Sequence, residues 1–238
     1  MRPSHAPQRI LIVGAGGFGR EVLHWARDAW PEWHDRIAGF LGRSVSPTPT
    51  VRAGQLEHSA DRSAQTRIPS VGDTGLRILA DPADYLPEPG DALLLAIGIP
   101  GVRRRVAETL AARGAEFLTL VHPTAVVAAT ATLGPGTIVC PQAVVSDSAA
   151  TGRCVLVNYH ASLAHDAVAG DYAVLSPYAA LAGAARVGAD AFLGLHASVG
   201  PGVVVGERSK VAANSCALND VPPESLVHGV PGRVTPLL

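Results

Sequence analysis

The stretch that decides the fold is residues 163–193, LAHDAVAGDYAVLSPYAALAGAARVGADAFL. Every sixth residue in it is Leu, Val or Ala, and this frame continues without an insertion from Val127 to Ala217. Thirteen of the sixteen residues in the frame are Val or Leu. A second frame, from Ala125 to Ser215 in steps of six, contains only Ala, Thr, Val and Ser. A period of six without helical periodicity predicts a β-helix of short strands.

Three such hexads make a triangular coil, so residues 18 apart stack at about the 4.8 Å spacing of neighbouring strands. The large apolar residue of each hexad points inward and the small one fits the crowded corner. Glycine often follows the inward residue, and we expect it to supply the backbone conformation that the turn needs; these glycines are Gly134, Gly152, Gly170, Gly188, Gly194, Gly200 and Gly206. The chain is 47% apolar but only 5% aromatic, which suits a narrow core of repeated layers.

The first half of the chain has a different pattern. An apolar run at residues 10–13 leads into a glycine-rich loop, and a helical pattern follows that loop. Further strands are expected at 37–42, 91–98 and 116–121, with a helix at 102–114 and loop with short strands at 43–75. Strands that alternate with helices predict a parallel sheet. We therefore expect a small Rossmann-like α/β domain over residues 1–121, followed by a β-helix over 122–238.

Composition excludes several classes of partner. The 238 residues carry a net charge of −1, which offers no basic surface for nucleic acid or for an anionic membrane. No apolar run reaches the length of about 18 residues that a transmembrane helix needs. The start, MRPSHAPQ, lacks the apolar segment of a secretion signal. The three cysteines (Cys140, Cys154 and Cys216) form no CxxC pair, so we expect free thiols in a cytoplasmic protein.

One histidine stands out within the repeat. His165 lies two places after the inward Leu163, which puts it at a corner facing outward. Gly183 is 18 residues further on, so it lies one coil along from His165, keeps space open beside the imidazole and leaves a backbone N–H accessible. Acyl transfer needs this combination of a base and a donor for the oxyanion. A solvated surface histidine is the alternative interpretation.

The segment from Asn158 to Gly183 carries a more specific pattern. Seven residues after Asn158 comes the pair His165-Asp166, and further matches follow at Gly170, Ser176-Pro177 and Gly183. Gly229-Val230-Pro231-Gly232-Arg233 matches a second motif near the end of the chain. In these motifs and in its domain order, the chain resembles the hexapeptide-repeat sugar O- and N-acetyltransferases of the sialic acid O-acetyltransferase and bacillosamine-pathway type.

The resemblance implies a left-handed β-helix and a homotrimer with its active sites between adjacent helices. It implies acetyl-CoA as co-substrate and direct attack on the thioester, which needs neither a metal nor a cysteine nucleophile. His165 is then the general base, Asp166 orients it, and the Gly183 N–H holds the thioester carbonyl. Asn158, Ala212 and Gly229 are the further residues expected to bind acetyl-CoA.

The glycine-rich loop has its own interpretation. Gly14, Gly16, Gly17 and Phe18 join a strand to the start of a helix, where backbone N–H groups bind phosphate well. No acidic residue follows the second strand, so a nicotinamide cofactor lacks its usual ribose partner. The resemblance implies that this loop holds the nucleotide of a nucleotide-linked amino sugar. The family often has histidine where Phe18 stands, acidic residues where Leu41-Gly42 stand, and a second histidine where Val174 stands. These departures leave the nucleotide open, and a purely structural turn is the alternative.

Other functions compete with N-acetyl transfer. O-acetylation of a free sugar or another small alcohol would use the same base, and the donor could be a longer acyl-CoA. A zinc carbonic anhydrase of the γ class is a second rival, because His160, His165 and His196 have spacings seen in that class. Its third ligand would have to come from position 201 or 124, where Pro201 and Thr124 stand. An inactive binding or scaffold protein is a third alternative.

Overall fold

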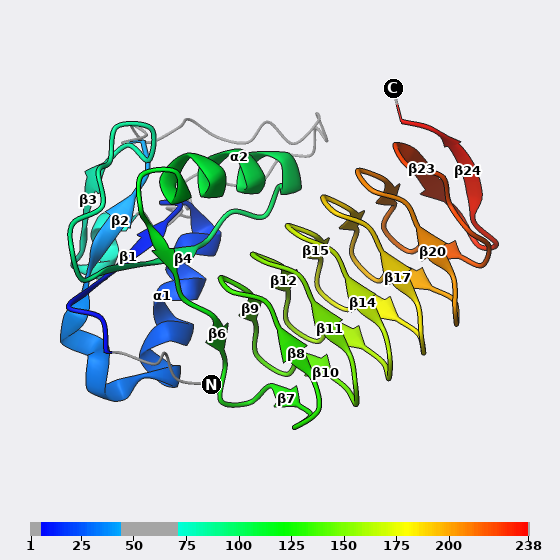
Figure 1. The fold of residues 1–238 in the computed structure, drawn as a ribbon, viewed down its shortest axis with the longest axis horizontal. Coiled ribbons are helices and arrows are strands. Elements are labelled where there is room, and N and C mark those ends of the chain that lie inside the picture. Colours follow the sequence, from blue (N-terminus) through cyan, green and yellow to red (C-terminus); the bar gives the residue numbers. More distant parts are fainter. Residues whose placement is uncertain (1–5, 44–70, 238) are drawn as a thin grey trace, which may run out of the picture.

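The computed structural model describes residues 6–43 and 71–237. The N-terminal part contains a parallel five-stranded sheet in the order β3-β2-β1-β4-β5 (Figure 1). Its strands are β1 (Arg9–Val13), β2 (Ile37–Leu41), β3 (Arg77–Ala80), β4 (Asp91–Leu95) and β5 (Glu116–Phe117). The helices are α1 (Gly17–Ala29), α2 (Pro100–Ala111) and the short 3-10 helices η1 (Pro31–Arg36) and η2 (Val71–Thr74). The sequence did not predict η1, η2 or a strand at β3.

Both faces of this sheet are covered, as a parallel sheet requires. Ile10 and Ile12 of β1 pack in one cluster with the buried face of α1. Leu11 and Val13, which point to the other face, pack in a second cluster with α2. The α/β domain therefore presents the carboxyl ends of β1, β2 and β4 at one edge, next to the glycine-rich loop.

The rest of the chain forms a left-handed β-helix with three sheets of short parallel strands, beside which the α/β domain lies (Figure 1). Face 1 consists of β7 (Val126–Val127), β10 (Val144–Val145), β13 (Ser162–Leu163), β16 (Ala180–Leu181), β19 (Ser198–Val199) and β22 (Cys216–Ala217). Face 2 consists of β8 (Thr132–Leu133), β11 (Ala150–Thr151), β14 (Val168–Ala169), β17 (Arg186–Val187) and β20 (Val204–Val205). Face 3 consists of β6 (Leu120–Val121), β9 (Ile138–Val139), β12 (Leu156–Val157), β15 (Val174–Leu175), β18 (Phe192–Leu193) and β21 (Lys210–Val211), with β23 (Ser225–His228) and β24 (Arg233–Pro236) at its far end.

The predicted register of 18 residues is confirmed in the strand pairing. Leu163 pairs with Leu181, and Leu181 pairs with Val199. The residues of both six-residue frames point into the interior of the triangular β-helix. Ala167 and Ala185 of the small frame are as fully buried there as Leu163. The core is narrow because a small residue, most often alanine, fills each corner and one residue, most often Val or Leu, fills each side.

The expected role of the seven glycines that follow inward residues is wrong. The residues with left-handed φ are two places further on, at Gly136, Cys154, Tyr172, Asp190, His196, Gly202 and Arg208. The glycines are needed for space instead, because at six of the seven positions a Cβ would collide with the next coil. At Gly170, for example, a Cβ would lie 2.7 Å from the backbone nitrogen of Ala189. The crowding comes from coils stacked at strand spacing, not from the turn itself.

The α/β domain packs on face 3. Outward residues of that face, Ile138, Leu156 and Val174, are buried in the same cluster as α1. The strand expected at 116–121 is in fact two strands in different sheets, since β5 completes the α/β sheet and β6 pairs with β9 of the β-helix. The chain passes from one core to the other between Phe117 and Leu120.

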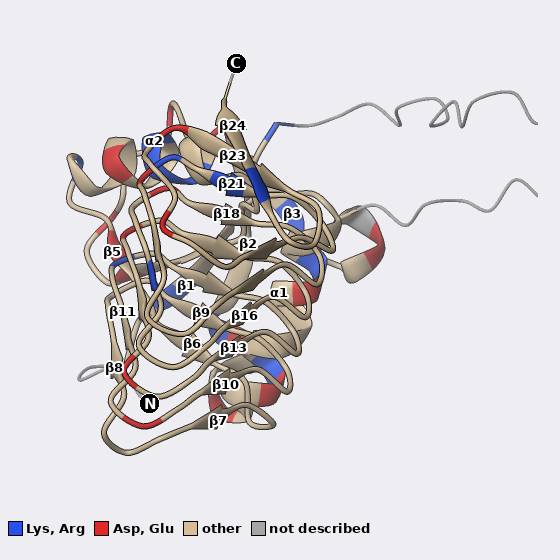
Figure 2. Cartoon of the chain, turned by 90° about the vertical axis from the view of Figure 1, so that its right-hand side faces the viewer, with Lys and Arg blue, Asp and Glu red and all other residues tan. Residues whose placement is uncertain are grey.

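The C-terminal segment ends in an antiparallel hairpin of β23 and β24, at the end of the β-helix far from the α/β domain (Figure 1). Lys, Arg, Asp and Glu are sparse on the β-helical coils (Figure 2). Within residues 6–43 and 71–237, no helix has the length and apolar character needed to cross a bilayer.

Candidate active site

The pair His165-Asp166 lies on the corner between faces 1 and 2, in the turn from β13 to β14. The turn is closed by a hydrogen bond from the Ala167 N–H to the Ala164 carbonyl, 3.2 Å long, and Asp166 has φ +62°. The Nδ1 atom of His165 lies 2.9 Å from Oδ2 of Asp166. With the carboxylate accepting from Nδ1–H, Nε2 carries the lone pair that a general base needs. The imidazole is 67% exposed, so an incoming molecule can reach it.

Gly183 occupies the same corner one coil along. A Cβ placed on it would lie 2.5 Å from Nε2 and 2.6 Å from Cε1 of His165. Only a glycine leaves this edge of the imidazole uncovered in the conformation observed. Within the described chain, the Gly183 N–H has no hydrogen-bond partner, whereas the neighbouring Ala184 N–H donates to the His165 carbonyl. This corner therefore brings together an oriented imidazole and a free backbone donor.

The residues expected to bind acetyl-CoA do not all meet at this corner. Asn158 and Ala212 lie at a different corner, between faces 3 and 1, and Asn158 Oδ1 accepts from the Tyr159 N–H at 2.8 Å. Gly229 follows β23, has φ +88° and donates to Oγ of Ser215. Face 1 separates this second corner from His165, so one copy of the chain does not place Asn158 and Ala212 beside the imidazole.

The histidines that suggested a zinc site do not converge. The Tyr178 ring is stacked between His160 and His196, with a centroid distance of 4.6 Å on each side. No group of three His, Cys, Asp or Glu side chains in the described part of the chain could hold a metal ion. The carbonic anhydrase alternative thus has no three-ligand site among these residues.

The glycine-rich loop lines a pocket of about 540 Å³ at the carboxyl edge of the α/β sheet. Gly14 and Gly16 contribute to its wall, and Gly16 is also the N-cap of α1. Gly14 needs its lack of a side chain, because it has φ +122° and the Ala96 carbonyl occupies the place of a Cβ. The pocket therefore joins a tight backbone turn to a helix N-terminus, which is a favourable place for phosphate.

Gly17 and Phe18, which the sequence grouped with Gly14 and Gly16, are not part of this wall. Phe18 packs edge-on against Trp25 of α1, with ring centroids 5.8 Å apart. Sequence reasoning missed three charged residues that do line the pocket, namely Arg43, Asp81 and Arg105. They come from separate segments, so no local motif could have found them. Arg43 Nε lies 2.9 Å from Asp81 Oδ2, and the Ala83 N–H together with Arg43 lowers the pKa of Asp81.

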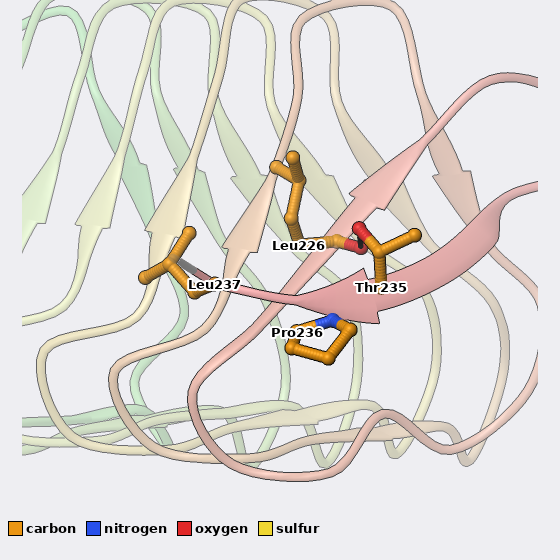
Figure 3. A pocket seen from close by; sticks show the side chains of 4 residues that line it. All are labelled: Leu226, Thr235, Pro236 and Leu237. Carbon is orange, nitrogen blue, oxygen red and sulfur yellow. Dashed lines mark hydrogen bonds between the residues drawn. The ribbon is translucent and has the colours of Figure 1, made fainter.

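A second hollow lies against the C-terminal hairpin. It is lined by Leu226, Thr235, Pro236 and Leu237 (Figure 3). None of these side chains can act as an acid, base or nucleophile at neutral pH. We therefore assign no chemistry to it.

Two cysteines, Cys140 and Cys154, fit a structural role. Cys140 is fully buried and Cys154 almost so, and burial raises the pKa of both thiols. A thiol with a raised pKa is a poor nucleophile, because the thiolate is the reactive form.

Comparison with known proteins bears on the fold and on the resemblance. No protein-family model matches the chain. It is 36% identical over 135 residues to the UDP-N-acetylbacillosamine N-acetyltransferase of Bacillus subtilis (strain 168). That alignment covers 56% of this chain and 51% of the relative, so the chain spans about half the length of the curated relative that it matches.

The solved structures that match almost the whole chain include the following two. PerB from Caulobacter crescentus, in complex with CoA and GDP-perosamine, is 27% identical with a TM-score of 0.76, over 95% of this chain and 97% of that one. The acetyltransferase domain of PglB from Neisseria gonorrhoeae FA1090 also has a TM-score of 0.76 at 23% identity, over 95% and 98% of the two chains. The likeness to the PglB acetyltransferase domain shows that the two chains share a fold. The resemblance to hexapeptide-repeat sugar N-acetyltransferases that the residues indicated is thereby confirmed.

Proposed function

We propose that this protein transfers an acetyl group from acetyl-CoA to the amine of a nucleotide-linked sugar, with His165 as the general base. The observation that carries the proposal is the corner at which Asp166 orients the imidazole and Gly183 leaves its Nε2 edge free. The relatives support it, since PerB is described with CoA and GDP-perosamine and the Bacillus subtilis protein is a UDP-sugar N-acetyltransferase.

The chemistry follows from these groups. The neutral amine of the acceptor attacks the thioester carbonyl carbon, so a C–N bond forms and the C–S bond then breaks. The amine proton passes to Nε2 of His165, and CoA leaves as the thiolate or thiol. Asp166 stabilises the imidazolium that forms, and the Gly183 N–H donates to the developing oxyanion. Cysteine takes no part.

The pocket beside Gly14 and Gly16 is the proposed acceptor site. The helix N-terminus at Gly16 and the cation of Arg105 suit the pyrophosphate of a nucleotide-linked sugar. We further propose a homotrimer, as the resemblance implies, without a metal in the chemistry and acting in the cytoplasm. A hydroxyl acceptor is the second candidate, because the same base could deprotonate it.

The proposal is tested first by binding and then by turnover. Acetyl-CoA and one member of a panel of UDP-, GDP-, dTDP- and CMP-linked amino sugars should each raise the melting temperature, since a ligand that binds the native state stabilises it. Release of CoA thiol should require both substrates. His165→Ala should lower kcat by about 10² to 10⁴, the usual contribution of a general base.

The control is His24→Ala, which removes an exposed histidine from α1 and should leave turnover unchanged. Near-normal turnover by His165→Ala would exclude His165 as the base. Turnover with hydroxyl sugars but not with amino sugars would move the function to O-acetylation. Zinc bound in stoichiometric amount, with CO₂ hydration lost on its removal, would favour the carbonic anhydrase alternative.

A further inference from the structure

The carboxyl end of β2 has no room for an acidic side chain. In dinucleotide-binding α/β folds, an acidic residue near this position accepts a hydrogen bond from a ribose hydroxyl. Here Leu41, the last residue of β2, is fully buried, and Gly42 follows it. A Cβ on Gly42 would lie 2.6 Å from the Cβ of Ala15, so a side chain at this position would collide with the glycine-rich loop. A carboxylate for a ribose would therefore have to come from another element.

The neighbouring strand β3 brings a carboxylate to the same edge of the sheet. β3 ends at Ala80, which pairs with Leu41, and the Gly42 N–H donates to the Ala80 carbonyl at 2.9 Å. Asp81 follows Ala80, so it lies next to Gly42, and it lines the pocket at the glycine-rich loop. Its side chain is 27% exposed, which leaves it accessible from that pocket.

The Asp81 carboxylate is held in one orientation by two donors. Oδ1 accepts from the Ala83 N–H and Oδ2 from Nε of Arg43, each at 2.9 Å. These two donors lower the pKa of the carboxyl, so it is ionised at neutral pH. An ionised carboxylate has about four lone-pair sites, so each oxygen can accept from one further donor. Two adjacent hydroxyl groups match these free acceptors.

We propose that Asp81 binds the 2′- and 3′-hydroxyls of the acceptor's ribose, so that the protein selects sugars linked to a ribonucleoside diphosphate over deoxyribonucleoside-linked ones. This assignment rests on the proposed function, which places the nucleotide in this pocket. The alternative is a purely structural Asp81. Its carbonyl accepts from the N–H groups of Asp84 and Tyr85 and so closes the turn after β3.

The order of the strands separates the charges as such a ligand requires. Gly16 at the start of α1 and Arg105 of α2 suit the phosphates, whereas Asp81 would repel them. Asp81 follows β3, two strands away from β1, which is about 10 Å at the usual strand spacing. A ribose can therefore contact Asp81 while the phosphates lie near Gly16.

The same order gives the ligand a direction. From β3 through β1 to β4, the sheet leads toward the β-helix (Figure 1). With its ribose at Asp81 and its phosphates near Gly16, the acceptor would point the sugar beyond the phosphates toward the part of the chain that carries His165.

Calorimetric titration of the wild-type protein with matched nucleotides tests the ribose contact. UDP and dUDP differ only in the 2′-hydroxyl, and GDP, CDP and ADP have the same kind of deoxy partner. Within the pair that binds, the ribonucleotide should have a Kd at least about tenfold lower, because the deoxy form lacks a hydrogen bond to a charged acceptor. Equal affinities within that pair would overturn the proposal. So would binding of dTDP alone, or of no nucleotide.

Asp81→Asn separates the ribose contact from the structural role. Asparagine keeps an oxygen for the Ala83 N–H but removes the charge. We expect the Kd of the ribonucleotide to rise about tenfold and that of its deoxy partner to stay nearly constant, so the preference is lost. Equal weakening of both nucleotides would mean that Asp81 only closes the turn. The matched control is Asp84→Asn, which removes an exposed carboxylate from the same turn outside the pocket wall and should keep the wild-type preference.

Acetyl transfer is measured separately, with amino sugars linked to the ribo and deoxy forms of the nucleotide that binds. Acetyl transfer with equal kcat/KM for the two forms would overturn the role of Asp81 and leave the proposed function standing. A ribose preference in binding without any acetyl transfer would support the contact with Asp81 and refute the proposed function.

Discussion

At the scale of single residues, the candidate site depends on the missing side chain of Gly183. Gly183→Ala would place a Cβ 2.5 Å from His165 Nε2, so the imidazole must turn away from its position beside Asp166. We expect kcat to fall by about tenfold to a hundredfold, because small misplacements of a catalytic group are costly. The melting temperature should change little, since the atoms that must move belong to an exposed side chain. Steady-state kinetics and a thermal melt measure both effects.

Gly200→Ala is the matched control for this substitution. Its Cβ would meet only ordinary contacts of 3.4 Å or more, and it lies on the same corner one coil further along. Turnover should therefore be close to that of the wild type. Equal losses in both variants would mean that Gly183 acts through the backbone of the corner and not through the space beside His165.

At the scale of elements, the repeat could be predicted from the sequence far better than the α/β domain. A period of six determines which residues point inward and which lie 18 apart, so the neighbourhood of His165 and Gly183 followed directly from counting. The pocket at Gly14 could be predicted only in part. Arg43, Asp81 and Arg105 reach it from three separate segments, and their meeting depends on the order of strands in the sheet. The expected strand at 116–121 is divided at residues 118 and 119 into β5 and β6. The sequence did not predict this division, because the residues on both sides of it are apolar.

The outward positions of the β-helix make a prediction at this scale. Val174 and Val204 both point out of the prism, but Val174 on face 3 is covered by the α/β domain and only 2% exposed, whereas Val204 on face 2 is 42% exposed. Val174→Ala should lower the free energy of unfolding by about 2 kcal/mol, from lost burial and a residual cavity. Val204→Ala should change it by about 0.5 kcal/mol or less. Urea denaturation at one protein concentration compares the two, and equal losses would contradict docking of the α/β domain on face 3.

At the scale of the whole molecule, a buried cation contacts both domains where they pack together. Arg103 of α2 is completely buried and donates to the carbonyls of Leu95 and Ile97 in the α/β domain, at 2.7 and 2.8 Å. It also donates to the Cys154 carbonyl of the β-helix, at 2.6 Å. Desolvation lowers its pKa to about 10, so it remains charged at neutral pH. The guanidinium fork suits this role because it bonds several oxygens in fixed directions.

Arg103→Met should lower the free energy of unfolding by about 3 kcal/mol or more, because several buried carbonyls lose their donor. The same helix lines the proposed acceptor pocket through Val102 and Val106, so the apparent KM for the nucleotide-linked sugar should rise while that for acetyl-CoA stays nearly constant. The matched control is Arg77→Met, which removes an exposed arginine from β3. Calorimetry and two-substrate kinetics separate the effects. A variant with wild-type stability and an unchanged acceptor KM would show that the wall of the pocket does not depend on the contact with the β-helix.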